Sequence, residues 1–298
     1  MADYIFKHIL ILNFSLVHLS AQNYQTSPFL SASNSNFQIK SCVLMNFFQT
    51  FLYTYSSYSN NANSFYFSSM IFSNFLSTAI FIDQKGVSIE NNAYSVNPLN
   101  LTTPKNRVHV KDCKFIKCKS VEGIGGGIYY RYNGTEQNSN FQIHKCSFIS
   151  CSAVSSACFY ASGCNINIQY MCAMACFAKY IQIFDCISTS IGLVECQFSQ
   201  FDQCSTLTND GESTSLFINS QSINFKLNNH TRCSVRDTAC CGYFASGFDL
   251  KYTLNSNVNC SGSNYIIFYA RHGSHKIDDS LFYMCQKNEA EIWKELCC

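Results

Sequence analysis

The cysteines are the residues of this chain whose number and spacing could most directly support chemistry. There are 19 of them, and residues 108–118 and 141–151 share the pattern apolar-x-apolar-x-x-Cys-x-Phe-x-x-Cys. Thiols at such spacing could form disulfides in an exported protein, and two Cys pairs could bind zinc. The alternative is that they are small buried side chains at equivalent positions of a structural repeat.

The repeat itself favours buried thiols over bridges or metal. Equivalent residues on parallel strands in register lie about 4.8 Å apart, whereas the Cβ atoms of a disulfide lie about 3.8 Å apart. Two columns of free thiols are therefore expected, one of Cys113, Cys146 and Cys196 and one of Cys118, Cys151 and Cys176. The pairs better placed for oxidation are Cys172/Cys176, Cys240/Cys241 and Cys297/Cys298.

Carboxylates are the second group that could do chemistry, because glycoside hydrolysis needs two of them across the scissile bond. Asp112, Asp185 and Glu195 each precede a repeat cysteine and are expected to point outward near one another. Asp278 and Asp279 follow an Arg-His-Gly segment, but the order does not match that of pectin-cleaving hydrolases. We interpret these groups as solvated surface charges and assign no catalytic, cofactor-binding or metal-ligating residue.

The chain contains a repeat whose apolar positions lie 0, 2, 5, 7 and 10 residues from the start of each copy. Its copies start 21 to 33 residues apart, which is the period of a solenoid. The expected starts are Ile9, Phe37, Phe65, Val87, Val108, Phe141, Ile166, Ile191 and His275, with weaker copies starting near Ile223 and Phe248. A second apolar segment follows most of these starts, as at residues 79–82 and 127–130.

The spacing predicts a coil of short strands. Positions 0 and 2 share one face of a strand, and a step of three residues keeps position 5 inside only if the chain bends there. A second step of three, from 7 to 10, implies a second corner. The pattern therefore predicts an all-β chain folded as a right-handed parallel β-helix solenoid of about ten or eleven rungs.

The composition agrees with this fold class and excludes others. The chain has 298 residues, of which 47% are hydrophobic and 13% charged, so disorder is excluded. Aromatics reach 15%, which suits strands. The net charge is +2 without a long basic run, so no nucleic-acid partner is expected.

The repeat resembles that of a known group of proteins. The Cys-x-Phe-x-x-Cys runs and the segment Gly125-Gly126-Gly127-Ile128 look like the motifs of polymorphic outer-membrane-type and similar protozoan surface proteins. Those proteins are right-handed, pectin-lyase-like β-helices, and Cys118 and Cys151 stand where they often have Asn. The resemblance implies an extracellular or cell-surface location. A corner that needs positive φ explains the three glycines without a phosphate-binding role.

The two ends of the chain have separate interpretations. Residues 1–21 are either a first rung or a signal peptide, since the apolar run fits both but Asp3 stands where a signal peptide is basic. The β-helix is expected to span residues 1–286. Residues 287–298 are predicted to form a capping helix, with Asn288 as N-cap and Trp293 or Ile292 over the last rung. No segment near this end is long enough for a membrane span.

These observations favour binding over catalysis. We expect a non-enzymatic surface or secreted protein with adhesin-like binding or display, whose partner is a glycan or a host or cell-surface protein. The alternative is a carbohydrate-active enzyme, a polysaccharide lyase or glycoside hydrolase, on the same scaffold. Three or more acidic residues that converge in one groove with an Arg or Lys would favour the enzyme. Acidic residues scattered over the surface would favour the binding protein. No cofactor is expected.

Overall fold

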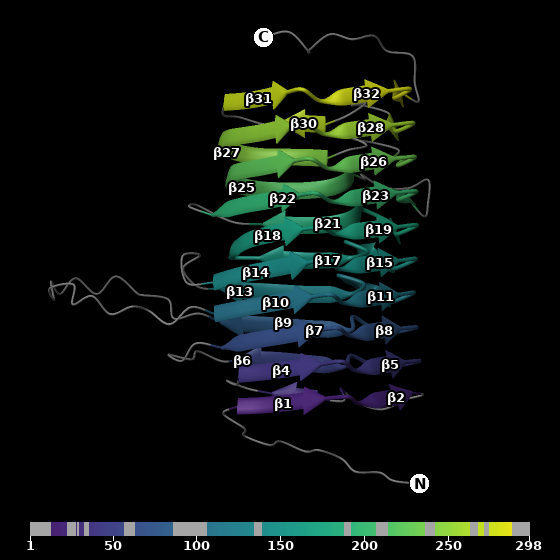
Figure 1. The fold of residues 1–298 in the computed structure, drawn as a ribbon, viewed down its shortest axis with the longest axis vertical. Helices are drawn as coiled ribbons and strands as arrows, with labels where there is room; N and C mark the ends of the chain where they lie inside the picture. The colour runs from purple at the N-terminus through teal and green to yellow at the C-terminus, as the bar shows by residue number, and fades with distance from the viewer. Residues whose placement is uncertain are drawn as a thin grey trace, which may run out of the picture.

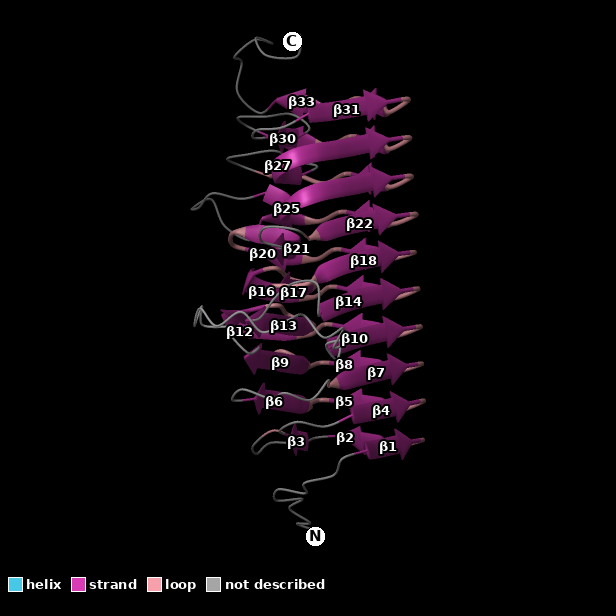
Figure 2. Cartoon of the chain, turned by 90° about the vertical axis from the view of Figure 1, so that its left-hand side faces the viewer, coloured by secondary structure: helices cyan, strands magenta, loops and turns pink. Residues whose placement is uncertain are grey.

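The chain folds into an elongated coil of parallel strands. The computed structural model describes residues 13–22, 28, 30–32, 36–56, 63–85, 106–133, 139–187, 192–206, 214–235, 242–262, 268–270 and 274–287. The elements in these residues are all strands, stacked along one axis from the N-terminal to the C-terminal end (Figures 1 and 2). The expected all-β fold, a parallel β-helix solenoid, is confirmed.

Each full rung begins with two faces separated by a sharp corner. The strands of the first face are β1 (Asn13–Val17), β4 (Asn36–Lys40), β7 (Ser64–Ser68), β10 (Asn106–Lys111), β14 (Ser139–His144), β18 (Asn165–Gln169), β22 (Leu193–Gln197), the later parts of β25 (Thr214–Lys226) and β27 (Gly242–Thr253), and β31 (Ser274–Asp278). The second face is a ten-stranded sheet of β2 (Ser20–Gln22), β5 (Val43–Met45), β8 (Ile71–Ser73), β11 (Lys114–Ile116), β15 (Ser147–Ile149), β19 (Cys172–Met174), β23 (Gln200–Asp202), β26 (Asn229–Thr231), β28 (Ser256–Val258) and β32 (Leu281–Tyr283).

The chain then passes a short third face and returns along a fourth. The third face consists of β12 (Lys119–Ile124), β16 (Ser152–Ser155), β20 (Phe177–Ala178), β24 (Ser205–Thr206), β29 (Ser261–Gly262) and β33 (Gln286–Lys287). The fourth face consists of β3 (Leu30–Ala32), β6 (Leu52–Ser56), β9 (Ile80–Lys85), β13 (Ile128–Asn133), β17 (Phe159–Ser162), β21 (Ile181–Ile187), the early parts of β25 and β27, and β30 (Phe268–Ala270).

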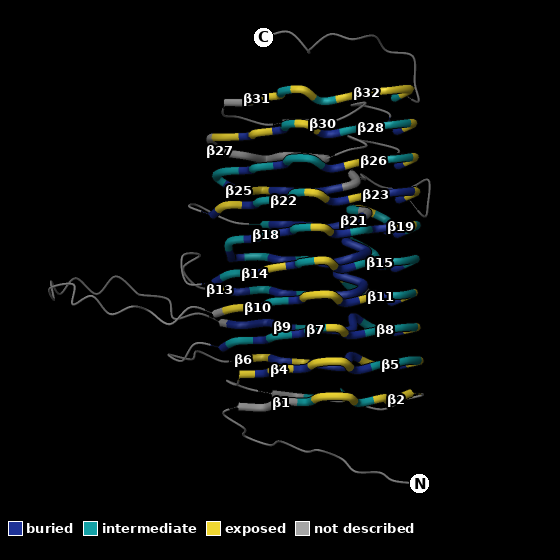
Figure 3. The backbone as a smooth tube through the Cα atoms, in the orientation of Figure 1, coloured by how far each residue is buried: buried dark blue, intermediate teal, exposed yellow. Residues whose placement is uncertain are grey.

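Two left-handed residues per rung produce the steps of three in the sequence pattern. One follows the first-face strand and one follows the second-face strand, as Asp112 (φ 52°) and Lys117 (φ 52°) do in one rung. The first of these corners lines up along the solenoid and is largely solvent-exposed (Figure 3). It carries bulky residues as well as polar ones, including Tyr170 and Phe198, although positive φ is unfavourable for bulky side chains.

The core is a set of columns of equivalent residues that point to the axis. Phe72, Phe115 and Phe148 are fully buried and stack on successive rungs, with ring centroids 4.9 and 4.7 Å apart. Beside them runs a column of buried cysteines from Cys118 to Cys260, which the partly exposed Cys285 extends to the last rung. Nearer the C-terminal end of the coil, some of the inward side chains are polar.

The polar part of the core is built on asparagine side chains that replace cysteine in one column. Asn228 Nδ2 donates to Cys196 O at 2.9 Å, and Asn255 Nδ2 donates to Phe225 O at 3.0 Å. Cys146 Sγ donates to the equivalent carbonyl, Val110 O, at 3.4 Å. Thiol and amide therefore satisfy the same backbone carbonyl of the preceding rung, which explains why both residue types occur inside.

The glycine segment is only partly explained by backbone conformation. Gly125 has φ +75°, as expected for a corner. Gly126 and Gly127 are required by close packing instead, because an added Cβ would lie 2.3 Å from Ala157 O or 2.8 Å from Cys158 O.

Three of the expected repeat starts are wrong in register, and a fourth falls on residues outside the description. The first described rung begins at Phe14, which pairs with Phe37, and not at Ile9. Another begins at Val194 instead of Ile191, and a third at Leu250 instead of Phe248. The fourth, the copy expected at Val87, lies outside the described residues, and the rungs on either side of it pair directly, Phe65 with Val108.

The register at Val194 changes the placement of two residues. Cys196 pairs with Ile168, so it does not share a column with Cys113 and Cys146 as predicted. Phe198 is 44% exposed at the corner, where its ring stacks on that of Tyr170 at 5.1 Å. Phe201 takes the inward position instead.

The predicted terminal features extend past the described part of the chain. Residues 13–22 pair with the next rung, whereas residues 1–12 lie outside the description. The capping helix expected at 287–298, with Trp293, also lies outside it beyond Lys287. Among the described residues, no helix has the length and apolar character needed to cross a bilayer.

Candidate functional site

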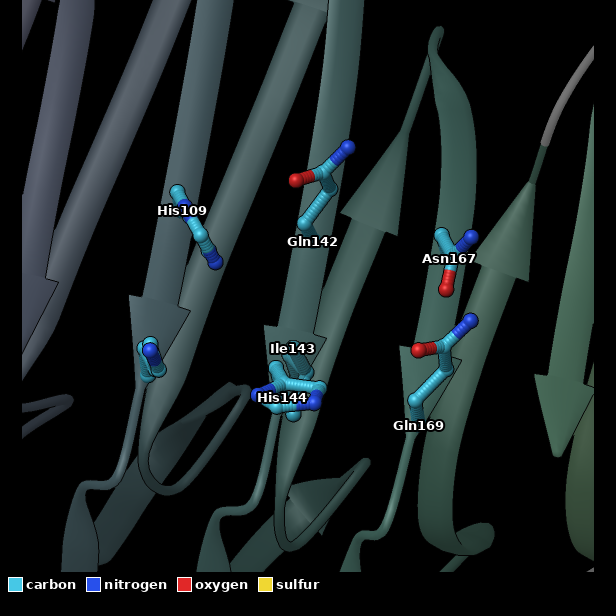
Figure 4. Close-up of a pocket in the computed structure, with 7 residues that line it drawn as sticks. His109, Gln142, Ile143, His144, Asn167 and Gln169 are labelled. Atoms are coloured by element: carbon cyan, nitrogen blue, oxygen red, sulfur yellow. The ribbon is translucent and has the colours of Figure 1, made fainter. Parts of the chain in front are cut away.

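The first face carries a shallow depression that spans three rungs. Its volume is about 360 Å³, and it lies over β10, β14 and β18 (Figure 4). The lining residues are His109, Lys111, Gln142, Ile143, His144, Asn167 and Gln169. Ile143 faces the core, and the other six side chains are outward positions of the three strands.

The six polar side chains form two rows that the strand register imposes. One row is His109, Gln142 and Asn167, and the other is Lys111, His144 and Gln169. Because the strands are parallel and in register, successive members of a row lie about 4.8 Å apart. The depression therefore presents donors and acceptors in a regular array along the solenoid axis.

Each of the two histidines in the depression lies beside a tyrosine ring, and His109 also lies near the cation of Lys111. The ring of His109 meets that of Tyr66 edge-on at 5.8 Å, and His144 meets Tyr170 edge-on at 5.6 Å. Partial burial lowers the pKa of His109, and the charges of His144 and Lys111 lower it further, while Asp112 acts in the opposite direction. The neutral form of His109 is therefore favoured, and the positive charge on the β10 side of the depression is that of Lys111.

The amides supply neutral hydrogen-bonding groups. Asn167 Nδ2 donates to Glu195 Oε2 at 3.2 Å, which fixes its orientation at the edge of the depression. In the described part of the chain, the side chains of Gln142 and Gln169 make no hydrogen bond, and both reach solvent. Each can therefore donate to and accept from a ligand.

A second cluster of polar groups lies on the outer side of the fourth face. Tyr53, Phe81, Tyr129 and Tyr160 stack on successive rungs with centroids 4.5 to 5.0 Å apart. Asp185 takes the next place in this row and is followed by Phe217. The row thus contains one carboxyl between aromatic side chains.

Asp185 is unusual among the described carboxyl groups. It is 7% exposed, and its Oδ1 has no hydrogen-bond partner among the described residues. Burial raises its pKa to about 7. In the adjacent row Arg131 binds Asp83 through two hydrogen bonds, one of them Nε to Oδ1 at 2.9 Å, which raises the pKa of the guanidinium.

The carboxylates singled out in the sequence do not come together. Asp112 is exposed at the first corner, Glu195 lies on the outer side of β22, and Asp185 lies on the fourth face. The expectation that they lie near one another is wrong, because it placed residues of two different faces in one column. Asp278 pairs with Lys276 at 2.7 Å, and Asp279 is exposed at the last described corner.

The described cysteines are buried thiols rather than bridges. All fifteen are free, and only Cys172 and Cys285 are partly exposed. Cys172 and Cys176 are not joined, and the pairs Cys240/Cys241 and Cys297/Cys298 lie outside the described residues. Burial raises the pKa of Cys151, and contact with Cys118 adds to the effect. Such thiols are poor nucleophiles.

The sequence contained a signal for the depression that was not recognised. Alternate residues of β10 read Arg107, His109, Lys111, which is the outward series of a strand whose other residues are apolar. The amides opposite, Gln142 and Gln169, are residue types that occur on any solvated strand. Only the register of three rungs brings the six side chains together.

Comparison with known proteins adds no assignment to this geometry. A scan of the chain against protein-family models, a search of characterised proteins and a search of solved structures each find no match.

Proposed function

We propose that this chain is a non-enzymatic binding protein, an adhesin-like β-helix that presents its first face to a glycan or to a cell-surface protein. The observation that supports this is the depression over β10, β14 and β18, whose outward lining consists of amides, histidines and a lysine. Amides and lysine bind hydroxyl and acidic groups through hydrogen bonds and charge.

The lining contains no carboxylate, which is the group that glycoside hydrolysis requires in pairs. Two acidic side chains contact lining residues: Glu195 accepts from Asn167, and Asp112 Oδ2 lies 4.0 Å from Lys111 Nζ. Asp112 is exposed and Glu195 is half-buried. The site is therefore suited to recognition. Surface display outside the cell is part of the proposal and rests on the repeat's resemblance to surface proteins.

A glycan array tests the proposal. The wild-type chain is expected to bind a defined subset of glycans, and a Gln142→Ala/Gln169→Ala variant to lose that binding. Asn224→Ala is the matched control, because Asn224 is also an outward amide of the first face but lies on β25. Equal binding by wild type and the double variant would place recognition elsewhere.

The second candidate function is a carbohydrate-active enzyme on the fourth face. Asp185 supports it, because a carboxyl whose pKa is about 7 can serve as a general acid near neutral pH. Tyr160 lies beside Asp185 on the preceding rung, and Arg131 lies one rung further back in the adjacent row. The cluster holds two acidic groups rather than three, and Asp83 is already bound to Arg131. Release of reducing ends or unsaturated products, lost in Asp185→Asn, would establish this alternative.

A further inference from the structure

The charge around the depression is far more positive than that of the chain as a whole. Residues 106–119 contain five Lys and Arg side chains and one acidic residue, Asp112, whereas all 298 residues together carry +2. The five are exposed, and so is Lys145, which follows the depression on the next rung. One rung and its neighbour thus form a basic band, consisting of Arg107, Lys111, Lys114, Lys117, Lys119 and Lys145.

Half of the basic band adjoins the depression. Arg107 and Lys111 stand on the outer side of β10, on either side of His109, and Lys145 follows His144 at the corner. In the described part of the chain neither Arg107 nor Lys145 has a carboxylate within ion-pair distance. Cations that repel one another and lack local partners form a surface that is complementary to an anion.

We propose that the depression binds a polyanionic glycan that runs along the solenoid axis across β10, β14 and β18. This inference rests on the proposed function and specifies its ligand. Arg107, Lys111 and Lys145 hold carboxylate or sulfate groups of the glycan. Gln142, Asn167 and Gln169 bind its hydroxyl groups. The cations are spread over two rungs instead of converging on one point, so a chain with repeated charges fits better than a single small anion.

The rings beside the depression favour a glycan over a single-stranded nucleic acid. Nucleic-acid grooves offer open aromatic faces on which bases stack. Here Tyr66 and Tyr170 meet the histidines edge-on, and the Tyr170 ring is also stacked on Phe198. The central strand β14 contributes only Gln142 and His144 to the polar lining, and an amide can pair with hydroxyls on both sides.

The experiment compares probes that differ in charge and in backbone. Binding of the full chain to heparin, polygalacturonate, neutral dextran and single-stranded DNA is measured by titration calorimetry at low and physiological salt. We expect heparin or polygalacturonate to bind, with affinity that falls as salt rises, and dextran not to bind. Comparing the affinity for heparin, which is sulfated, with that for polygalacturonate, which carries only carboxylates, identifies which acidic group is preferred.

Two charge-matched variants locate the site. Arg107→Gln/Lys111→Gln is expected to weaken binding of the acidic glycan about tenfold or more, as for the loss of charge-assisted hydrogen bonds. Lys226→Gln/Lys251→Gln removes the same charge from the same face, where Lys226 pairs with Gln197 on β22 and Lys251 lies on β27, and is expected to bind normally. Circular dichroism verifies that both variants are folded.

The outcomes separate this inference from the function on which it rests. Equal weakening in both variants would mean general attraction to charge and would overturn the inference. DNA binding as tight as heparin binding, and equally dependent on Lys111, would overturn it in favour of nucleic acid. Dextran binding that requires Gln142 but not Lys111 would show that the ligand is a neutral glycan. That result would overturn the inference of a polyanionic ligand and leave the proposed function standing. If none of the glycans binds, the inference fails, and the glycan array decides separately whether the proposed function fails with it.

Discussion

The ring of Phe148 lies 4.7 Å from that of Phe115, measured between centroids, and the two planes are within 5° of parallel. Both side chains are fully buried. Phe148→Ala would leave a ring-sized cavity between rungs, and we expect it to lower the free energy of unfolding by about 3–5 kcal/mol. Urea denaturation followed by circular dichroism measures this difference.

Phe198→Ala provides the comparison for that measurement. The side chain is exposed at the corner and contacts Tyr170, so its removal is expected to cost less than about 1 kcal/mol. A large loss at Phe198 together with a small one at Phe148 would mean that the register of these rungs is reversed.

His230 is expected to make stability depend on pH. Its ring is fully buried, both nitrogens lack a hydrogen-bond partner among the described residues, and burial lowers its pKa to about 4. The unfolded chain binds this proton near the ordinary pKa of about 6.5, so stability falls as pH decreases from about 6.5 to about 4, by about 3 kcal/mol. His230→Phe removes the titrating group and fits an aromatic column.

The measurement is the difference in unfolding free energy between wild type and His230→Phe at pH 7 and pH 4. This difference should shift by about 3 kcal/mol in favour of the variant at the lower pH. A difference that stays constant with pH would show that the imidazole is solvated or hydrogen-bonded in the folded chain.

Asp185 should change the pH dependence of folding stability in the direction opposite to that of His230. Its pKa is raised from 3.8 to about 7, so the folded state favours the protonated carboxyl. Stability is therefore greatest below about pH 4 and is lost as pH rises toward 7, by up to about 4 kcal/mol. Asp185→Asn keeps the shape without the charge, and its melting temperature should exceed that of wild type at pH 8.

The control for Asp185 is Asp83→Asn, which removes a carboxylate from the same face. Asp83 is bound by Arg131, so this change breaks a hydrogen-bonded pair and should lower the melting temperature at pH 8. Equal stabilisation by both changes would mean that the cluster as a whole carries excess negative charge, and that Asp185 has no special environment.

Reactivity toward a thiol reagent should follow burial. Among the described cysteines, Cys172 and Cys285 are partly exposed and are expected to be alkylated in the native protein. Burial raises the pKa of Cys151 and Cys158, so these thiols should react only in denaturant. Peptide mass spectrometry after brief alkylation gives the result for each site. Rapid native labelling of Cys151 would show that the column opens to solvent.

The sequence predicted the fold because the strongest repeats carry large apolar side chains at all inward positions. The rungs that begin at Val108 and Phe141 pair as the pattern requires. The spacing 0, 2, 5, 7, 10 nearly maps onto itself when shifted by five residues, which explains why the pattern places a start at Ile9 in place of Phe14. At Val194 the buried position is polar, Ser199, while its exposed neighbour is Phe198, so hydrophobicity indicated the wrong register.

The candidate site could not be predicted from residue types alone. His109 and Gln142 are 33 positions apart in sequence and become neighbours only through the pairing of β10 with β14. The intervals between rungs vary, so no fixed period relates the two. Asp185 was recognised as a carboxylate, but its raised pKa arises from burial on the outer side of a strand, where a sequence pattern predicts solvent.

The direct pairing of β7 with β10 and of β9 with β13 has a consequence for how the chain can change in length. β9 ends at Lys85 and β10 begins at Asn106, yet the coil continues without a missing rung. Lengthening such a connection costs little, because loop-closure entropy grows only slowly with length. One residue added between Val110 and Cys113 would instead turn every later inward side chain of that rung outward. A foreign peptide or domain inserted between Lys85 and Asn106 is therefore expected to leave the pairing of the described rungs intact.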